Sequence, residues 1–311
     1  MRLAARFVSA INSMSRKPVK PGQIEIPIQR EREPDRHHAQ GGRSFYFFDF
    51  DDNIAHIGTP TLVFHKETQA ELQIPSHEYV LHQHQIGRSG KYADYEVSYC
   101  ESDGSFRFFR DHGESEEIAD QHFVADIKAT VQRPNYTWQG PSWPCFYHAV
   151  FNHRPLALIT ARGHHPETLK KGIIEFVENG LIPNEPNYLA LFPVSNQQVQ
   201  KDLGMVGEKD IALLKRAAIR KSVEKAFKVY GQSPYHRFGM SDDDPRNLDL
   251  ILKAMRELKS TYCENSFFVI STHGGEHVKT EVFHDHTEES KFDSFDQLSL
   301  LDDDSGQKNS P

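Results

Sequence analysis

The sequence predicts an α/β protein built on a doubly wound parallel sheet, with a mixed or β-rich unit inserted into it. The first observation is an alternation of short apolar runs with amphipathic helical patterns over residues 155–271, which is typical of parallel strands covered by helices. The second is one more apolar run far upstream, at residues 45–48. A crossover between parallel strands needs only about a dozen residues, so most of the stretch between the two runs is expected to be an insertion.

Composition narrows the class of protein further. The chain has 311 residues and a net charge of −8, which allows a sizeable core and gives no general attraction to nucleic acid or to an anionic membrane. No stretch approaches the roughly 18 apolar residues of a transmembrane helix. Cys100, Cys145 and Cys263 form no CxxC pair, which favours a reducing compartment. We therefore predict a cytoplasmic protein with no membrane contact and no general binding of nucleic acid.

The two ends of the chain differ in composition from its middle. Residues 1–44 are expected to be a basic leader and linker without fixed structure, since the first part is basic and the second is rich in charges and proline. The basic residues within positions 1–20 also fit a mitochondrial presequence, which would place the protein in the matrix instead. Residues 284–311 are expected to form a disordered acidic tail whose apolar residues offer a docking segment for a protein partner.

The first apolar run ends in a group of carboxylates. The four bulky residues 45–48 predict a buried strand, and Asp49, Asp51 and Asp52 follow it. Ligand sites of open α/β sheets lie at the carboxyl ends of the strands. Grouped carboxylates are costly to bury unless a cation or a proton compensates their charge. The pattern therefore indicates a hard divalent metal with oxygen ligands.

The insertion is predicted over residues 65–150, so that the core comprises residues 45–64 and 151–283. Short alternating patterns and scattered glycines within the insertion predict short strands joined by turns. Trp138 and Trp143, close to its end, are expected to pack where the chain returns to the core.

Regular alternation of strands and helices follows the insertion. Pro166 suits the first turn of a helix that Gly180 ends, a second helix is expected at residues 209–228, and Asp244-Pro245 opens a third. The strands other than the first are expected at residues 61–64, 155–160, 188–194, 237–240 and 266–271.

Polar residues follow three of the core strands. Besides Asp49 and its neighbours, Thr160 and Arg162 end the strand at 155–160, and Asp242 and Asp243 follow the strand at 237–240. Because the carboxyl ends of parallel strands lie along one edge of a sheet, these groups are expected to converge. Carboxylates from two strands suit Mg²⁺, and a hydroxyl with a cation opposite them suits the phosphate with which Mg²⁺ commonly shares its shell.

The order of these motifs resembles that of the haloacid dehalogenase superfamily of phosphatases. That family carries an apolar strand with DxDx(T/V), a strand-ending threonine or serine, a lysine and an acidic strand end. These are matched in turn by residues 49–53, Thr160, Lys215 or Lys221, and residues 241–244. The resemblance covers roughly residues 44–272 without most of the insertion. Asn53 departs from the usual threonine or valine, and Arg246 stands where a further acid often lies.

The resemblance implies a role for each matched residue. Asp49 would be the nucleophile that forms an aspartyl-phosphate, and Asp51 would protonate the leaving oxygen and later activate water. Mg²⁺ would be held by Asp49, the backbone carbonyl of Asp51 and Asp242, with support from Asp243. Thr160 would bind the phosphoryl group, assisted by Arg162. Lys215 would balance the negative charge.

Two functions follow as expectations. The first is a Mg²⁺-dependent phosphatase acting on a small phosphorylated substrate, with the insertion serving as a cap that selects the substrate and excludes water. The second is a catalytically weak relative that binds a phosphorylated ligand or a protein partner, which the departure at Asn53 keeps open. The sequence leaves the identity of the substrate open.

Overall fold

A seven-stranded sheet lies at the centre of the molecule. The computed structural model describes residues 31–112, 117–118 and 121–292, and within these ranges the strand order is β10-β9-β8-β7-β1-β5-β6. The strands are Ser44–Phe48 (β1), Leu156–Thr160 (β5), Tyr188–Pro193 (β6), Arg237–Asp242 (β7), Ser266–Ser271 (β8), His277–Val282 (β9) and Thr287–Phe292 (β10). Strands β6, β5, β1, β7 and β8 run parallel, as predicted, whereas β9 and β10 are antiparallel.

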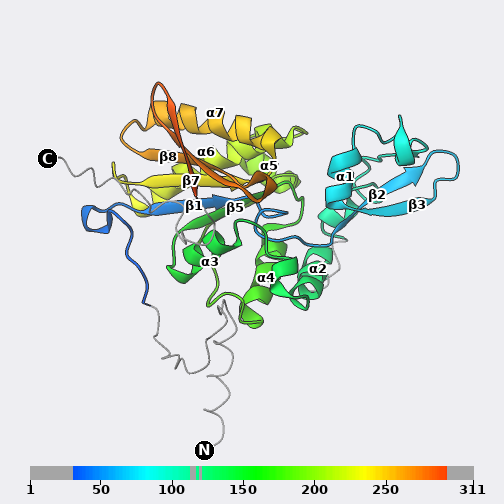
Figure 1. The fold of residues 1–311 in the computed structure, drawn as a ribbon, viewed down its shortest axis with the longest axis horizontal. Coiled ribbons are helices and arrows are strands. Elements are labelled where there is room, and N and C mark those ends of the chain that lie inside the picture. The colour runs from blue at the N-terminus through cyan, green and yellow to red at the C-terminus, as the bar shows by residue number, and fades with distance from the viewer. Residues whose placement is uncertain (1–30, 113–116, 119–120, 293–311) are drawn as a thin grey trace, which may run out of the picture.

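Helices cover both faces of this sheet (Figure 1). The α-helices of the described ranges are Ser76–His82 (α1), His122–Val131 (α2), Trp143–Phe151 (α3), Pro166–Glu178 (α4), Gln197–Asp202 (α5), Ile211–Tyr230 (α6) and Pro245–Thr261 (α7), of which α1 lies beside the small sheet described below. Tyr46 and Phe48 of β1 pack toward α2, α3 and α4, while Phe45 and Phe47 pack toward α6 and α7. Successive side chains of a strand point to opposite faces, so the aromatic run of β1 anchors both layers. In the described ranges, no helix combines the length and apolar character needed to cross a membrane.

The ends of the helices follow local signals in the sequence. Asp210 and Asp244 each accept hydrogen bonds from backbone N–H groups in the first turns of α6 and α7, which satisfies donors that have no partner within the helix. Pro166 and Pro245 occupy the first turns of α4 and α7. Gly180, with a φ of +68°, lies just beyond the end of α4, where glycine carries no steric penalty.

The first part of the insertion forms a small antiparallel sheet in the order β3-β2-β4. Its strands are Pro60–His65 (β2), Glu71–Pro75 (β3) and Tyr95–Glu96 (β4). It has a separate apolar cluster of Val63, Ile74, Ile86 and Tyr92. Residues 61–64 are expected in the core, and this expectation is wrong. They belong to β2, which pairs with β3 and β4, and Val63 is buried in the small apolar cluster and not in the main one.

The second part of the insertion is helical and packs on the main sheet. Helices α2 and α3 contribute to the same apolar cluster as Tyr46 and Phe48. Trp138 stacks on Phe176 of α4 at 5.5 Å between ring centroids, and Trp143 meets the same ring edge-on at 5.2 Å. The packing expected of these tryptophans is confirmed. The insertion as a whole is therefore mixed, as expected, with its strands in the first part and most of its helices in the second.

Part of the predicted N-terminal linker is packed against the core. Asp35 is buried, forms an ion pair with Arg154 at 2.8 Å, and accepts a hydrogen bond from the backbone N–H of Ser44. The expectation of an unstructured segment is therefore wrong for residues 33–44, since a buried carboxylate with a charged partner holds them in place. Residues 1–30, which include the possible presequence, lie outside the described residues.

Part of the predicted acidic tail is a strand. Residues 287–292 form β10, which pairs along its length with β9. Lys291 of β10 also forms an ion pair with Glu276, just before β9. The expectation of disorder is wrong for these residues, because pairing with an adjacent strand satisfies their backbone groups without requiring an apolar pattern. Residues 293–311, and with them the suggested docking segment, lie outside the described residues.

Candidate active site

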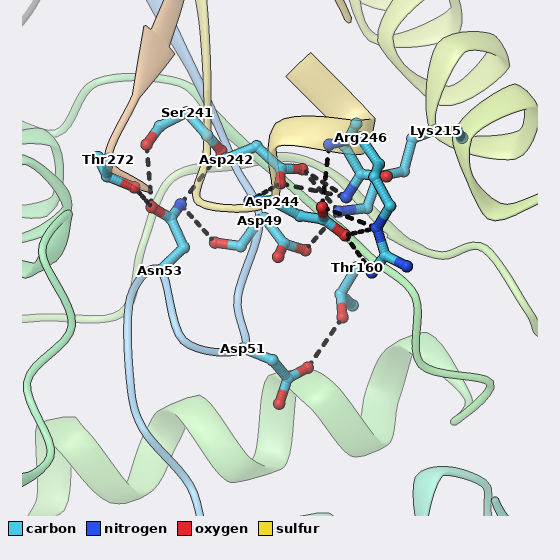
Figure 2. A network of polar contacts seen from close by, with 12 residues as sticks. Asp49, Asp51, Asn53, Thr160, Lys215, Ser241, Asp242, Asp244, Arg246 and Thr272 are labelled. Carbon is cyan, nitrogen blue, oxygen red and sulfur yellow. Dashed lines mark hydrogen bonds and ion pairs between the residues drawn. The ribbon is translucent and has the colours of Figure 1, made fainter. Parts of the chain in front are cut away.

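Three neighbouring strands bring polar side chains to one edge of the main sheet. Strand β1 lies between β7 and β5, and the three run parallel, so their carboxyl ends are adjacent. Figure 2 shows Asp49 beside Asp242 and Lys215, whereas Asp51 points toward Thr160. The structure thus divides the predicted residues into two groups, one around Asp49 and one around Asp51.

The first group is an acidic cluster formed by Asp49, Asp242 and Asp243. Each residue offers one carboxylate oxygen, and these oxygens lie within 4.8 Å of one another. Asp49 and Asp242 are buried and Asp243 is partly buried. Oxygen donors at this spacing, drawn from two strand ends, suit a hard divalent cation such as Mg²⁺. The side chain of Asp51 is not part of this cluster.

Lys215 is the lysine that reaches the acidic cluster. Its Nζ lies 3.0 Å from Asp49 Oδ1 and 2.7 Å from Asp242 Oδ2, and its side chain is almost completely buried. Lys221, the alternative that the sequence left open, lies one and a half turns further along α6 and is half-exposed beside Glu224. The position of Lys215 on the buried side of α6 therefore decides between them.

The charges of the acidic cluster are not fully balanced by Lys215. Burial raises the pKa of Asp49 well above its usual range; Lys215 opposes this rise, and Asp242 and Asp243 add to it. Burial, followed by the charge of Asp242, raises the pKa of Asp243 to about 7. Burial lowers the pKa of Lys215, but its contacts with Asp242 and Asp49 outweigh burial and raise that pKa overall. One ammonium facing three carboxylates leaves room for a further cation or for protons.

Asp242 is held in place by the start of α7. Its Oδ1 accepts hydrogen bonds from the backbone N–H of Asp244 at 3.0 Å and from Asn247 Nδ2 at 3.1 Å. Asp244 itself caps α7 and pairs with Arg246 at 2.8 Å, so it does not belong to the acidic cluster. The turn from β7 into α7 therefore fixes the orientation of Asp242.

The second group surrounds Asp51. Its Oδ2 accepts a hydrogen bond from Thr160 Oγ1 at 3.2 Å. Arg162 donates to both oxygens of Asp51, with Nη2 at 2.8 Å from Oδ1 and Nε at 2.9 Å from Oδ2. Arg162 was expected to bind the substrate together with Thr160. The structure engages its Nε and Nη2 with Asp51 and Thr59. The buried Nη1 has no hydrogen-bond partner among the described residues, so binding of the substrate by Arg162 stays a prediction.

Asn53, the departure from the family pattern, connects four segments of the chain. Its side-chain amide donates to the backbone carbonyls of Asp49 and Ser241, both at 3.1 Å. Its Oδ1 lies within hydrogen-bond distance of the hydroxyls of Ser142, Ser241 and Thr272. The side chain is fully buried. Asn53 therefore ties the turn after β1 to the ends of β7 and β8 and to the residue before α3.

Sequence reasoning missed the residues that surround Arg162. Its guanidinium lies 4.9 Å from the ring centroid of Phe109 and 4.8 Å from that of Phe123, and its Nη2 donates to Thr59. All three come from the region around the insertion, far from Arg162 in sequence. No spacing pattern in the sequence indicates that these residues surround Arg162, so only the three-dimensional structure shows these contacts.

Comparisons of the chain with models of protein families, with curated protein sequences and with solved structures find no match. The interpretation of the site therefore rests on its own geometry and chemistry.

Proposed function

We propose that this protein is a Mg²⁺-dependent phosphatase of the haloacid dehalogenase type, which hydrolyses a phosphate monoester through an aspartyl-phosphate. The observation that carries the proposal is the separation of two carboxylates at the end of β1. Asp49 lies in the acidic cluster beside Lys215, while Asp51 stands apart beside Thr160. A nucleophile next to a cation site, with a second carboxylate free of that site, is what phosphoryl transfer with acid catalysis requires.

The acidic cluster fits the proposed metal. Its donors are all carboxylate oxygens, it is largely buried, and Lys215 leaves part of its negative charge unbalanced. Asp49, Asp242 and Asp243 would hold Mg²⁺. When bound, Mg²⁺ supplies positive charge that offsets the charge on the phosphoryl oxygens.

The chain supplies the groups for both halves of the reaction. In the first half, an oxygen of Asp49 attacks phosphorus, the bond from phosphorus to the leaving oxygen breaks, and Asp51 gives that oxygen a proton. In the second half, a water oxygen attacks the phosphorus of the aspartyl-phosphate while Asp51 takes a proton from the water. The bond to Asp49 then breaks, which releases inorganic phosphate and restores both carboxyl groups. Lys215 stabilises the charge that develops around phosphorus, while the hydroxyl of Thr160 donates to Asp51.

The contacts of the insertion with the loop after Thr160 support a cap over this site. The chain enters β2 shortly after Asp51, and the backbone carbonyl of Phe109 in the insertion accepts a hydrogen bond from Gly163 at 2.8 Å. Asp111 accepts another from the backbone N–H of His165. The insertion is thus joined to the loop that follows Thr160, where a cap can select the substrate and exclude water.

The test is the hydrolysis of p-nitrophenyl phosphate with Mg²⁺ and with EDTA. The wild-type protein is expected to release phosphate in the presence of Mg²⁺ and not in the presence of EDTA. Asp49→Asn is expected to release none under either condition. Asp52→Asn is the matched control, because Asp52 adjoins the site but lies outside the acidic cluster and contacts His56. Equal rates in wild type and Asp49→Asn would overturn the proposal.

A second candidate is a catalytically weak relative that binds a phosphorylated ligand. The observation that favours it is that Arg162 and Thr160 occupy both oxygens of Asp51. Calorimetry with inorganic phosphate in the presence of Mg²⁺ separates the two functions. Binding to wild type and to Asp49→Asn, without turnover of any aryl phosphate by wild type, would favour the binding function.

A further inference from the structure

We propose that Arg162 is a positioning residue that holds the carboxyl group of Asp51 in the orientation needed for proton transfer to the leaving group. This inference rests on the proposed phosphatase function and deepens it. It assigns Arg162 to Asp51 and not to the substrate, and it makes the insertion responsible for the geometry of acid catalysis.

The contact between the two residues fixes an orientation as well as a distance. Arg162 Nε and Nη2 lie 2.9 and 2.8 Å from different oxygens of Asp51. Two parallel N–H donors on a planar guanidinium define the plane and direction of a carboxylate, which a single hydrogen bond does not. Thr160 adds a third bond, to Oδ2.

The guanidinium is itself held rigidly. It lies between the rings of Phe109 and Phe123, with 4.9 and 4.8 Å to their centroids. Its Nη2 also donates to Thr59 at 2.8 Å, and the hydroxyl of Thr59 donates to Asp126 of α2. A guanidinium that packs between two rings and donates a hydrogen bond to a third residue has little freedom to move, so it can hold the carboxylate that it binds in one orientation.

The burial of the pair is strongly asymmetric. The side chain of Arg162 is 1% exposed, whereas that of Asp51 is 29% exposed. Burying an ion pair costs desolvation free energy, which its attraction offsets only with excellent geometry and complete hydrogen bonding, and the buried Nη1 of Arg162 has no hydrogen-bond partner among the described residues. Here the arginine is buried and the carboxylate remains accessible. This arrangement is the one expected when the carboxyl group must meet a substrate and its partner must not.

The insertion and the segment leading into it supply the surroundings of Arg162. Phe109 and Phe123 belong to the insertion, and Thr59 directly precedes β2. Asp51, Thr160 and Arg162 follow strands of the main sheet, whereas both rings against the guanidinium come from the insertion, Phe123 from the helix α2 that packs in the main apolar cluster. The insertion therefore acts on acid catalysis through Arg162 without touching the substrate there.

The test compares aryl phosphates that differ in the basicity of the phenol that leaves. A weakly basic leaving group such as 2,4-dinitrophenolate needs no proton, whereas the leaving group of phenyl phosphate does. The quantity measured is kcat/KM, because it covers the steps up to loss of the phenol and excludes hydrolysis of the aspartyl-phosphate. The variants are Arg162→Lys, which loses the paired donors, and Asp51→Asn, which loses the acid.

Arg162→Lys is expected to lose about 100-fold in kcat/KM on phenyl phosphate and less than about fivefold on the dinitrophenyl ester, since positioned acid catalysis is worth about 10² to 10⁴. Asp51→Asn is expected to show the same dependence on the leaving group. In the double variant, the ratio of kcat/KM on the dinitrophenyl ester to that on phenyl phosphate is expected to be no larger than in Asp51→Asn alone, because the two residues act as a unit. Arg107→Lys is the matched control, since Arg107 pairs with Glu71 in the insertion; its dependence on the leaving group should equal that of wild type.

Two outcomes would count against the inference, and a third would refute the function on which it rests. Equal losses on all esters in Arg162→Lys, with a raised KM, would show that Arg162 binds the substrate directly and would overturn it. If Arg162→Lys fails to fold, Phe109→Leu is used in its place, because it removes one of the two rings that contact the guanidinium and keeps the arginine. An unchanged dependence of kcat/KM on the leaving group in that variant would overturn the inference. Absence of any turnover by wild type would instead refute the proposed phosphatase function.

Discussion

Asn53 shows how a single side chain can connect segments that are distant in sequence. Its amide bonds to two backbone carbonyls and lies near three hydroxyls, all of them buried. The usual threonine or valine of the related motif has no such set of donors and acceptors. The departure that cast doubt on turnover thus has a structural explanation, since the asparagine holds Asp49 and Ser241 in register at the edge of the sheet.

We predict that Asn53→Asp lowers the free energy of unfolding by about 2–4 kcal/mol, because it turns a donor that faces two carbonyls into a further acceptor and leaves buried groups unpaired. Urea denaturation of both proteins measures the loss. Asn184→Asp is the control, since Asn184 makes only an exposed contact with its neighbour Glu185 among the described residues. A loss no larger than that of the control would contradict the structural role of Asn53.

His164 provides a prediction about pH. It is fully buried, and burial, followed by the charges of Arg162, His122 and His112, lowers its pKa well below 6.5. Below pH 6.5 the unfolded chain binds a proton at this position that the folded chain does not. The stability that neutral His164 contributes is therefore complete above pH 6.5 and is lost as the pH falls toward the lowered pKa, by at most about 1.4 kcal/mol per pH unit.

The variant His164→Gln checks this sign. As the pH falls from 7.5 to 5.5, the free energy of unfolding of wild type is expected to fall relative to that of the variant. The slope of this difference against pH should approach the value for the binding of one proton. A difference that does not change with pH would contradict it. The slope is informative even if the variant is less stable throughout, because only the pH dependence is compared.

At the scale of elements, the packing of α2 against α4 positions one wall of the Arg162 pocket. Gly172 of α4 lies directly against the ring of Phe123 from α2, and a Cβ at this position would come within 2.6 Å of Phe123 Cδ1. The ring is fully buried, and the interiors of proteins are close-packed. Glycine therefore allows α2 to approach closely enough for Phe123 to cover the guanidinium.

Gly172→Ala sets helix propensity against packing. Alanine favours the helix by about 1 kcal/mol, whereas overpacking of a core costs about 1–3 kcal/mol. Because Phe123 is fully buried, we expect the cost of overpacking to exceed the gain in helix propensity, so that the melting temperature falls. Adding Phe123→Leu should recover part of the loss, since it removes the ring atoms in conflict. A melting temperature above that of wild type for Gly172→Ala would contradict the close approach.

The edge strand β10 shows why an element can escape sequence analysis. It carries mostly Thr, Glu, Ser and Lys residues, and the side chains of residues 287–291 are partly buried or exposed. Strand prediction depends on a buried, apolar pattern. A strand at the edge of a sheet needs only backbone pairing on one side, and charged side chains there prevent pairing with other chains. Composition therefore suggested a disordered tail where the structure has a strand.

At the scale of the whole molecule, the acidic cluster joins the ends of β1 and β7. A cation bound there would link two strands of the central sheet and would stabilise the folded state over the unfolded one. At a concentration about 100 times its Kd, such a ligand adds about 2.7 kcal/mol to the free energy of unfolding. Mg²⁺ binding should therefore be visible in thermal unfolding even without a substrate.

We predict that Mg²⁺ raises the melting temperature of wild type, that EDTA reverses the rise, and that Asp242→Asn abolishes it. Asp52→Asn should respond as wild type does, because Asp52 lies outside the acidic cluster. An equal response of Asp242→Asn and wild type to Mg²⁺ would contradict a metal site at these residues. The variants are compared by their response to the ion, since removing a buried charge also changes the stability of the metal-free protein.

Much of this protein follows from the sequence by itself. The parallel strands from β5 to β8 and the helices α4, α6 and α7 depend on local periodicity and on residues such as Asp244 and Pro166, so they could be predicted with nearly correct bounds, whereas the short helix α5 was not predicted. The convergence of Asp49, Thr160 and Asp242 could be predicted as well, because parallel strands present their carboxyl ends at one edge.

Only the tertiary structure decided which side chains meet. It assigned Lys215 to the acidic cluster, paired Arg162 with Asp51 and placed Asn53 among buried hydroxyls. It also moved β2 into the small sheet and added β9 and β10 to the large one. The periodicity of apolar residues indicates which side of a segment is buried, but it does not indicate which other segment that side packs against. Contacts between residues far apart in sequence depend on how the chain folds back on itself, and in this protein those contacts define the site.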